Sequence, residues 1–226
     1  MSEPLLNANV DLTGGVPGVD GALDPGPQAP KHHLTRDKHG NLRMQDISLA
    51  RKIRNRIGIL LFNNLITFVP SHSVRQNFLR LFGATIGEDT SILRGTTILD
   101  IEGLTIGNCC SIGFRCMFDA RGGITIGDNV VIASDTHFIG GFHDHNDPEF
   151  PPILQPTVVD DYVWIASRAT IMSGLHIGRG AVVAGCSMVR KDVGALDVVG
   201  GVPAKKLSTR DPNALQYKPK YRPLFY

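Results

Sequence analysis

The chain has 226 residues, of which 42% are hydrophobic and 19% are charged, and its formal net charge is +2. This composition is typical of a soluble protein with one modest domain and some extensions. A net charge so close to zero gives no indication of a nucleic acid partner, and we expect none. The first 30 residues lack the basic start and apolar core of a signal peptide, and the four cysteines show no zinc spacing. We therefore expect a cytoplasmic protein.

Residues 1–45 are rich in Gly, Pro, Asp and Asn and show no periodicity. Such a segment cannot bury enough apolar surface to order itself, so we expect a flexible tail. His32, His33 and His39 lie in or beside it. They suit either a short metal-binding tract or, more simply, a solvated linker.

Residues 46–84 are predicted to form two helices, the first ending before Pro70 and the second running from Ser73 to Phe82. In the first helix, basic residues precede an apolar run that starts at Ile57 and is too short and too polar to span a bilayer. Two interpretations stay open. The helices either cap the open end of the following fold or lie on a membrane, with cations on lipid phosphates. The basic residues are Arg51, Lys52, Arg54 and Arg56.

A six-residue repeat dominates residues 85–193, and a fixed short period indicates a solenoid. The first place of each hexad is aliphatic or Phe, the second is usually small, and the fifth is small or short-branched. Each hexad is one short strand and a turn, so three hexads form a triangular coil whose first-place side chains stack inside. We expect second-place glycines to supply the positive φ of the turns. We also expect the cysteines of this region to be buried structural thiols. The first places are Ile86, Ile92, Ile98, Ile106, Ile112, Phe118, Ile126, Ile132, Phe138, Val159, Ile165, Ile171, Ile177, Val183 and Val189.

The repeat is interrupted once, and residues 139–158 are predicted to leave the coil as an extruded loop. A solenoid insertion emerges on one side and is a common place for function. This loop carries the sequence GGFHDHNDPEF, and the segment after the last hexad contains VVGGVPAKKL.

The repeats, the loop and this closing segment resemble the hexapeptide-repeat acyltransferases. Within that family the chain resembles bacterial sugar and polysaccharide O-acetyltransferases, such as the maltose, galactoside and colanic-acid types. The resemblance implies a mainly β fold, a left-handed parallel β-helix that assembles as a homotrimer, with residues 194–226 as closing segment and tail. It also implies acetyl-CoA or another acyl-CoA as co-substrate, with no metal.

The same resemblance implies that His143 is the general base that takes a proton from the acceptor hydroxyl, with His145 as the alternative. Imidazole titrates near neutral pH, which suits acyl transfer from a thioester to a hydroxyl. A carboxylate of the loop is expected to orient the imidazole. The candidates are Asp144, Asp147 and Glu149.

For the coenzyme, the segments VWIASRAT and VVAGCSMVRKDV resemble the CoA-lining coils of the family. The match places Ser167 and Gly185 along the pantetheine arm, and Arg190 and Lys191 near the adenine-phosphate end. Arg168 and Lys205 are further basic candidates.

The acceptor is expected to be a sugar or glycan, with Asp119 and Arg121 as candidate contacts. Some sugar acetyltransferases have Asn where this chain has Gly113, which argues against a simple maltose or galactoside acceptor.

Three alternative functions remain. The first is an N-acyltransferase that acts on an amino or nucleotide sugar, and the second is a catalytically silent trimer. The third is a metalloenzyme similar to the γ-type carbonic anhydrases, in which imidazoles would hold zinc. Its ligands would come from His137, His143, His145 and Asp147.

Overall fold

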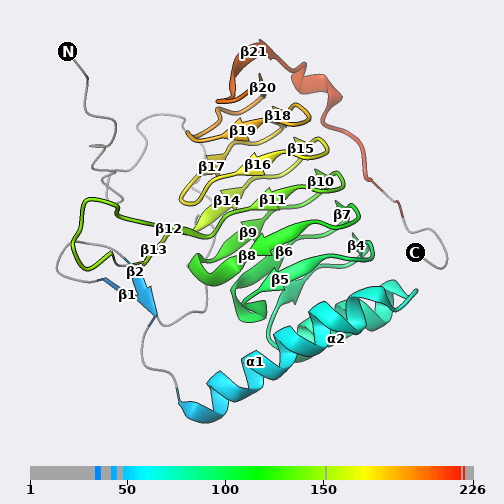
Figure 1. Ribbon diagram of the computed structural model, residues 1–226. Coiled ribbons are helices and arrows are strands. Elements are labelled where there is room, and N and C mark those ends of the chain that lie inside the picture. Colours follow the sequence, from blue (N-terminus) through cyan, green and yellow to red (C-terminus); the bar gives the residue numbers. More distant parts are fainter. Residues whose placement is uncertain (1–33, 37–41, 45–47, 151, 220, 222–226) are drawn as a thin grey trace, which may run out of the picture.

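The computed structural model describes residues 34–36, 42–44, 48–150, 152–219 and 221. Its main body is a parallel β-helix with three sheets, and two helices lie across one end of it (Figure 1). Sheet I contains β3 (Thr85–Ile86), β6 (Leu104–Ile106), β9 (Ile124–Ile126), β14 (Thr157–Val159) and β17 (His176–Ile177). Sheet II contains β4 (Ser91–Ile92), β7 (Ser111–Ile112), β10 (Val131–Ile132), β15 (Trp164–Ile165), β18 (Val182–Val183), β20 (Asp197–Gly200) and β21 (Lys205–Thr209). Sheet III contains β5 (Thr97–Leu99), β8 (Met117–Asp119), β11 (His137–Phe138), β16 (Thr170–Ile171) and β19 (Met188–Val189).

The predicted inward columns are confirmed. Every first-place residue of the hexads is at most 7% exposed. In sheet I, Ile86 pairs in register with Ile106, which pairs with Ile126, and after the interruption Val159 continues the same column. Each such buried aliphatic side chain contributes about 1.5–3 kcal/mol relative to exposure. The fold class predicted from the sequence, a mainly β parallel β-helix of hexapeptide repeats with a helical region before it, is therefore confirmed.

The turns differ from the expectation. The second-place glycines that the structure describes do not have positive φ. They are required instead because neighbouring coils approach closely, and a Cβ on Gly107 would lie 2.6 Å from the carbonyl carbon of Gly127. Positive φ falls at the fourth place of each hexad that is followed directly by another, where Asp and Asn tolerate it better than most residues do. These fourth-place residues are Asp89, Gly95, Cys109, Arg115, Asn129, Asp135, Tyr162, Arg168, Gly174, Gly180 and Cys186.

The expectation of buried thiols in the repeat region is confirmed for two cysteines, while Cys109 is only half-buried and Cys186 is exposed. Cys110 and Cys116 occupy fifth places and are fully buried, and burial raises the pKa of each thiol to about 12. Cys109 and Cys186 occupy fourth places at the corners, where Cys186 is exposed. The hexad position therefore decides whether a cysteine lies inside the coil.

The helices before the coil are α1 (Leu49–Asn64) and α2 (His72–Leu81), joined by the 3₁₀ turn η1 (Ile66–Phe68). The hydroxyl oxygens of Ser48 and Ser71 accept hydrogen bonds from the first turns of α1 and α2. One face of each helix packs on the first coil, where Phe62 and Leu79 are completely buried. No helix in the described ranges is long and apolar enough to cross a bilayer.

Polar side chains of this helical segment satisfy the open main-chain edge of the first coil. The amide of Asn63 both donates to the carbonyl of Ile98 and accepts from its N–H, each at 3.0 Å. The fully buried guanidinium of Arg75 donates to the carbonyl of Ile92 through Nε (3.0 Å) and Nη2 (2.7 Å). Burial, and then the nearby charge of Arg94, lowers the pKa of Arg75 to about 10. Similar bonds run from Arg80 to Ile86, from Gln76 to Thr90 and from Thr67 to Thr96.

Each of the three sheets thus receives a polar cap at its first strand, which removes an exposed edge that would otherwise pair with another chain. The capping interpretation of residues 46–84 is supported by these contacts. Capping uses one face of α1 only, so it does not decide between the two interpretations for the other face.

At the opposite end the coil extends beyond Val193, the boundary expected from the repeats. Strand β20 pairs in parallel with β18, placing Val199 beside Val183, and β21 turns back antiparallel to β20. The hexad spacing is lost after Val189, so strand β20 could not be predicted from the repeat. The chain then passes the 3₁₀ turn η4 (Pro212–Ala214) and lies along the coil, where the Tyr217 hydroxyl donates to the Tyr162 carbonyl at 3.1 Å.

A small fourth sheet lies beside the coil, with strand order β1-β2-β13-β12. Strands β1 (Leu34–Arg36) and β2 (Leu42–Met44) fall in the segment predicted to be a flexible tail. They are ordered as strands because β13, which is outside the coil, offers a free edge, and Leu154 of β13 pairs with Leu42. The rest of residues 1–45, with His32, His33 and His39, lies outside the described residues.

Removing one polar cap should destabilise the coil. We expect Asn63→Ala to lower the free energy of unfolding by about 1–3 kcal/mol, because both main-chain groups of Ile98 lose their partner. Among the residues that the structure describes, the neighbouring Asn64 side chain donates to the Leu60 carbonyl of its own helix. Asn64→Ala is the matched control and should cost less than about 0.5 kcal/mol in urea denaturation. Equal losses in both variants would contradict the capping role.

Candidate functional site

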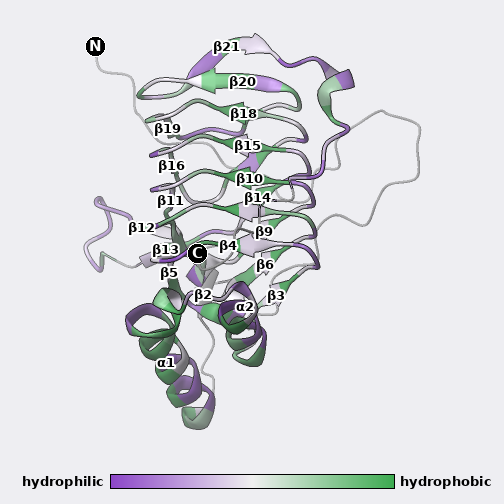
Figure 2. Cartoon of the chain, turned by 90° about the vertical axis from the view of Figure 1, so that its right-hand side faces the viewer, coloured by the Kyte–Doolittle hydropathy of each residue, from purple (hydrophilic) through white to green (hydrophobic). Residues whose placement is uncertain are grey.

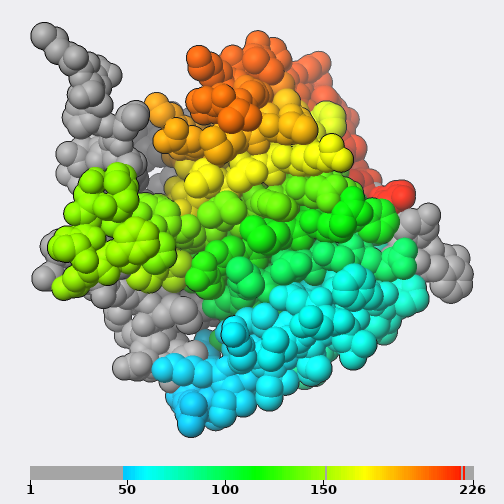
Figure 3. Space-filling view, viewed as in Figure 1, coloured from blue at the N-terminus to red at the C-terminus, as the bar shows by residue number. Residues whose placement is uncertain are grey.

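The insertion leaves the coil between Phe138 and Val159, as expected from the sequence, and within it the chain forms a β-hairpin. It contains β12 (Gly141–His143) and β13 (Pro152–Leu154), which pair antiparallel with His143 opposite Pro152. The hairpin emerges at the corner between sheets III and I, after β11, and extends outward from the coils (Figures 1 and 3). The root is tightly packed, since a Cβ on Gly140 would clash with the main-chain oxygen of Asp119.

The side chain of His143 is held by one residue across the hairpin tip. Its Nδ1 lies 2.8 Å from the carbonyl oxygen of Phe150, and the two rings stack with centroids 4.4 Å apart and planes 8° apart. A carbonyl oxygen can only accept, so Nδ1 carries the proton, and in the neutral imidazole Nε2 then has the free lone pair. His143 is exposed, which leaves Nε2 open to a ligand.

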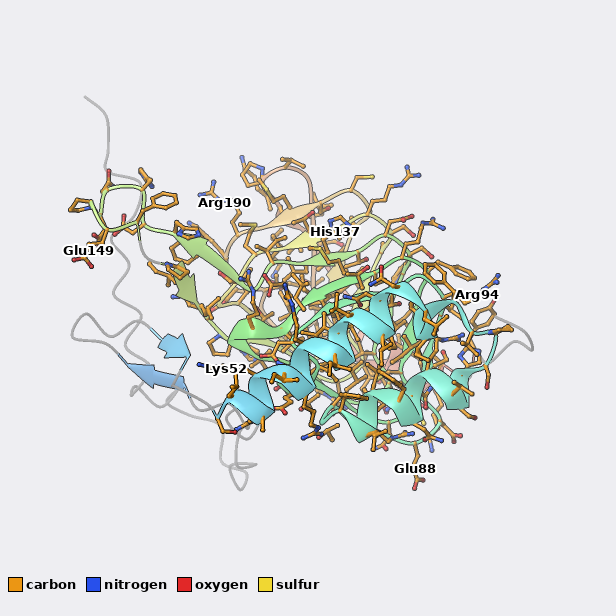
Figure 4. The ribbon with its side chains drawn as sticks, turned by 60° about the horizontal axis from the view of Figure 1, so that its bottom comes forward. Lys52, Glu88, Arg94, His137, Glu149 and Arg190 are labelled. Atoms are coloured by element: carbon orange, nitrogen blue, oxygen red, sulfur yellow. The ribbon has the colours of Figure 1, made fainter. Side chains whose placement is uncertain are left out.

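In the described part of the hairpin, the group that holds His143 is the Phe150 carbonyl and not a carboxylate. Asp144 and Asp147 instead accept hydrogen bonds from the main-chain N–H groups of Asn146 and Glu149, each at 2.9 Å, and so stabilise the turn. His145 and Glu149 are exposed, and Figure 4 shows Glu149 at the tip, away from the coils. The orienting group expected from the sequence was a carboxylate, and the structure has the Phe150 carbonyl there.

Sequence reasoning missed Phe150. Its backbone has a φ of 45°, in the left-handed region that a bulky residue rarely adopts. The sequence gives no clear signal for the contact between Phe150 and His143. The two residues are seven positions apart, and they meet through a turn whose shape depends on Asp144 and Asp147. The left-handed conformation directs the carbonyl and the ring of the same residue to His143.

Two of the predicted coenzyme residues lie on one corner of the coil. Ser167 and Gly185 are exposed and stand one above the other between sheets II and III. The Ser167 carbonyl is 3.3 Å from where a Cβ of Gly185 would be, and it accepts a hydrogen bond from the N–H of Cys186 at 3.0 Å. A side chain at residue 185 would project over this backbone, so glycine leaves the main chain of the corner accessible.

The two predicted phosphate contacts lie on the next corner, between sheets III and I. Arg190 and Lys191 are exposed and follow β19 directly. Strand β19 pairs with β16, which pairs with β11, so these cations stand above the root of the hairpin. Two coils separate them, which is roughly 10 Å. Figure 4 shows Arg190 and His137 on the coil and the hairpin tip away from it.

Asp119 and Arg121, the candidate acceptor contacts, form an ion pair with each other. Arg121 donates to both carboxylate oxygens of Asp119, at 2.8 Å and 2.7 Å. The Asp119 side chain is 7% exposed, and its contact with Gly140 lies at the hairpin root. This placement favours a structural role under the hairpin, and a role as sugar contact stays a prediction.

A shallow depression of about 240 Å³ lies on sheet II, and sequence reasoning did not foresee it. Val131, Trp164, Arg210 and Tyr217 line it. Trp164 is 45% exposed there rather than filling a corner inside the coil. The depression is on a different side of the coil from the hairpin.

The described residues contain no group of three or more His, Cys, Asp or Glu side chains arranged to hold a metal ion within one chain. His137 is exposed at the start of β11, on the coil, whereas His143 and His145 are on the hairpin. The set proposed for zinc is therefore not assembled in a single chain.

Known proteins share this architecture and part of this sequence. A chloramphenicol acetyltransferase from Klebsiella aerogenes is 38% identical over 117 residues, which cover 49% of this chain and 53%, or about half, of that protein. The putative colanic acid biosynthesis acetyltransferase WcaF of Escherichia coli K12 is 34% identical over 136 residues, which cover 60% of this chain and 75% of WcaF. The chain belongs to the hexapeptide-repeat acetyltransferase family. No protein-family model matches the sequence.

A solved member of this family has the same fold. A hexapeptide-repeat acetyltransferase from Vibrio cholerae O1 biovar eltor, in complex with acetyl coenzyme A, is 27% identical and superposes with a TM-score of 0.66. The superposition covers 75% of this chain and 93% of that chain. The resemblance stated from the repeats, the hairpin sequence and the closing segment is thereby confirmed at the level of the family.

In this hexapeptide-repeat acetyltransferase, Phe150 should fix the tautomer of His143. We expect Phe150→Ala to reduce the population of the Nδ1–H form, because the turn that presents the carbonyl loses its stacking contact. Ring nitrogen chemical shifts in NMR measure the tautomer. Phe142→Ala is the matched control, since Phe142 is an exposed aromatic of the same hairpin that pairs with Ile153. If both variants kept the wild-type tautomer, the positioning role of Phe150 would be wrong.

Proposed function

We propose that the protein is an acetyl-CoA-dependent O-acetyltransferase that acts on a sugar or glycan hydroxyl, with His143 as the general base. The observation that carries the proposal is the contact between Nδ1 of His143 and the Phe150 carbonyl at 2.8 Å. It leaves Nε2 as a proton acceptor on an exposed arm, as a base of this kind requires.

The reaction needs no protein nucleophile. The acceptor hydroxyl attacks the thioester carbonyl of acetyl-CoA and gives its proton to Nε2 of His143. The tetrahedral intermediate then collapses, the carbon–sulfur bond breaks, and the imidazolium returns the proton to the departing CoA thiolate. The buried thiols of Cys110 and Cys116 are protonated at neutral pH and take no part, because burial raises their pKa to about 12.

The coenzyme is proposed to lie along the corner of Ser167 and Gly185, with its phosphates near Arg190 and Lys191. An open corner with accessible main chain suits the amide-rich pantetheine arm, and exposed cations suit phosphates. The acetyl coenzyme A complex of the Vibrio relative supports acetyl-CoA as the donor.

We propose a homotrimer in which the hairpin of one subunit meets the coil of the next. The outward direction of the hairpin in Figure 1 supports this arrangement, since His143 stands on an arm while the coenzyme residues stand on coil corners. The glycan acceptor is supported by the relative WcaF, which is named for colanic acid biosynthesis. A cytoplasmic location is proposed because acetyl-CoA is a cytoplasmic metabolite.

Removing the base should abolish most of the activity. We expect His143→Ala to lower turnover by about 10²- to 10⁴-fold, with folding and CoA affinity nearly unchanged. Thiol release from acetyl-CoA, measured with a panel of glycan acceptors, gives the rate. His145→Ala is the matched control on the same hairpin and should be mild. A severe His145→Ala with a mild His143→Ala would show that the other imidazole is the base.

Removing a phosphate contact should weaken coenzyme binding more than it slows the reaction. We expect Lys191→Ala to raise KM for acetyl-CoA about 5- to 30-fold, which corresponds to about 1–2 kcal/mol of binding free energy. Turnover should change little, because a contact to phosphate binds ground state and transition state alike. Lys206→Ala is the control, since Lys206 is paired with Asp197 at 2.6 Å on the closing hairpin. Stoichiometric zinc with no CoA binding in calorimetry would contradict the proposed donor.

A further inference from the structure

Helix α1 is apolar on two opposite faces. Its inner face packs on the coil through Gly58 and Phe62. The outer face carries a stripe of large apolar side chains that are between 42% and 73% exposed. Leu49, Ile53, Ile57 and Leu60 are three or four residues apart and so share one side of the helix, while Leu61 and the C-cap residue Leu65 extend this surface at its C-terminal end. We call this set the outer stripe; its members are Leu49, Ile53, Ile57, Leu60, Leu61 and Leu65.

The outer stripe lies at one end of the molecule. Helix α1 runs across the base of the coil, so its outer face is directed away from the coils (Figures 1 and 4). Figure 2 shows the apolar colouring of α1 at this end. Coils that assemble side by side would cover the lateral faces and leave this end face open. A contiguous exposed apolar surface of this kind marks a contact with another molecule or a membrane.

The charges of α1 are all of one sign, because its sequence contains basic residues and no Asp or Glu. Two of the cations help to attach α1 to the first coil. Arg51 lies 2.6 Å from Glu102 of the first coil, and Arg54 lies 3.8 Å from the same carboxylate while it donates to the Leu81 carbonyl. Arg56 and Lys52 are exposed and one turn apart, on a flank of the outer stripe. Their positive charge beside apolar side chains is the pattern of a helix that lies on an anionic lipid surface.

We propose that the outer stripe of α1 docks on an anionic membrane surface, with α1 lying in the plane of the headgroups. The apolar side chains enter the boundary between headgroups and acyl chains, and Arg56 meets lipid phosphate. A second copy of this chain fits less well, because two identical basic helices would bring their cations together. The inference stands apart from the proposed acetyl transfer, since binding can be measured without an acceptor.

Co-sedimentation with vesicles tests the proposal. The full-length protein should bind phosphatidylcholine vesicles that contain phosphatidylglycerol, and raising the salt concentration should weaken binding because exposed charges are screened. The double variant Ile53→Ser, Leu60→Ser should bind at least about tenfold more weakly, because two inserted side chains are lost. Leu207→Ser is the control. Leu207 is 65% exposed on β21, at the opposite end of the coil, and its loss should leave binding unchanged.

Three results would overturn the inference. The first is no binding of the wild type to anionic vesicles at low salt. The second is equal binding by the wild type and the double variant when circular dichroism shows both folded. The third is a lower molar mass of the double variant in sedimentation equilibrium, which would show that a second copy covers the stripe. Thiol release with a soluble acceptor should be the same in both proteins, so a failure of the docking proposal and a failure of the proposed activity are distinguishable.

Discussion

The vertical stacking of the coils is the constraint on which the rest of the structure depends. Each inward side chain packs on the one above it, as Ile92 packs on Ile112 in sheet II, so every coil must repeat the outline of its neighbour. The stack therefore has two open main-chain edges that the coils themselves cannot satisfy. At the first edge, Arg75 and Asn63 supply hydrogen bonds from side chains. At the last edge of sheet II, β21 supplies them from main chain, by turning back on β20.

The same constraint separates scaffold from function. A coil of fixed outline has no room for the extra residues between Phe138 and Val159, so they leave it as a hairpin that makes its own main-chain pairs. The corners are the other free places, because their side chains are not part of the inward columns. The candidate base lies on the hairpin and the candidate coenzyme residues lie on two corners that flank sheet III. The candidate functional residues thus lie at positions whose side chains do not take part in the stacking of the coils.

Stacking also explains what could be predicted from the sequence. The inward columns could, since each hexad must present an apolar first residue, and a period of six is visible without any contact information. The role of Gly107 could not, because its need for a missing side chain arises from Gly127, a full coil away. Phe150 could not for a similar reason. Its carbonyl reaches His143 only through the turn of the hairpin, and the analogy with catalytic triads suggested a carboxylate in that role.

Helix α1 shows most clearly what could not be predicted, because an apolar run in the sequence does not reveal which face of the helix is buried. In the structure, Phe62 and Asn63 pack on the first coil from one side of the helix. The outer stripe therefore lies on the other side and is directed away from the coil. The hairpin belongs to the third strand of sheet III counted from this base, so its root stands about two coils, or roughly 10 Å, above it. A membrane bound at the base would therefore run below the hairpin at a distance that a few sugar units span. The cap that closes the β-helix thereby also sets the height of the candidate base above the surface that α1 is proposed to bind.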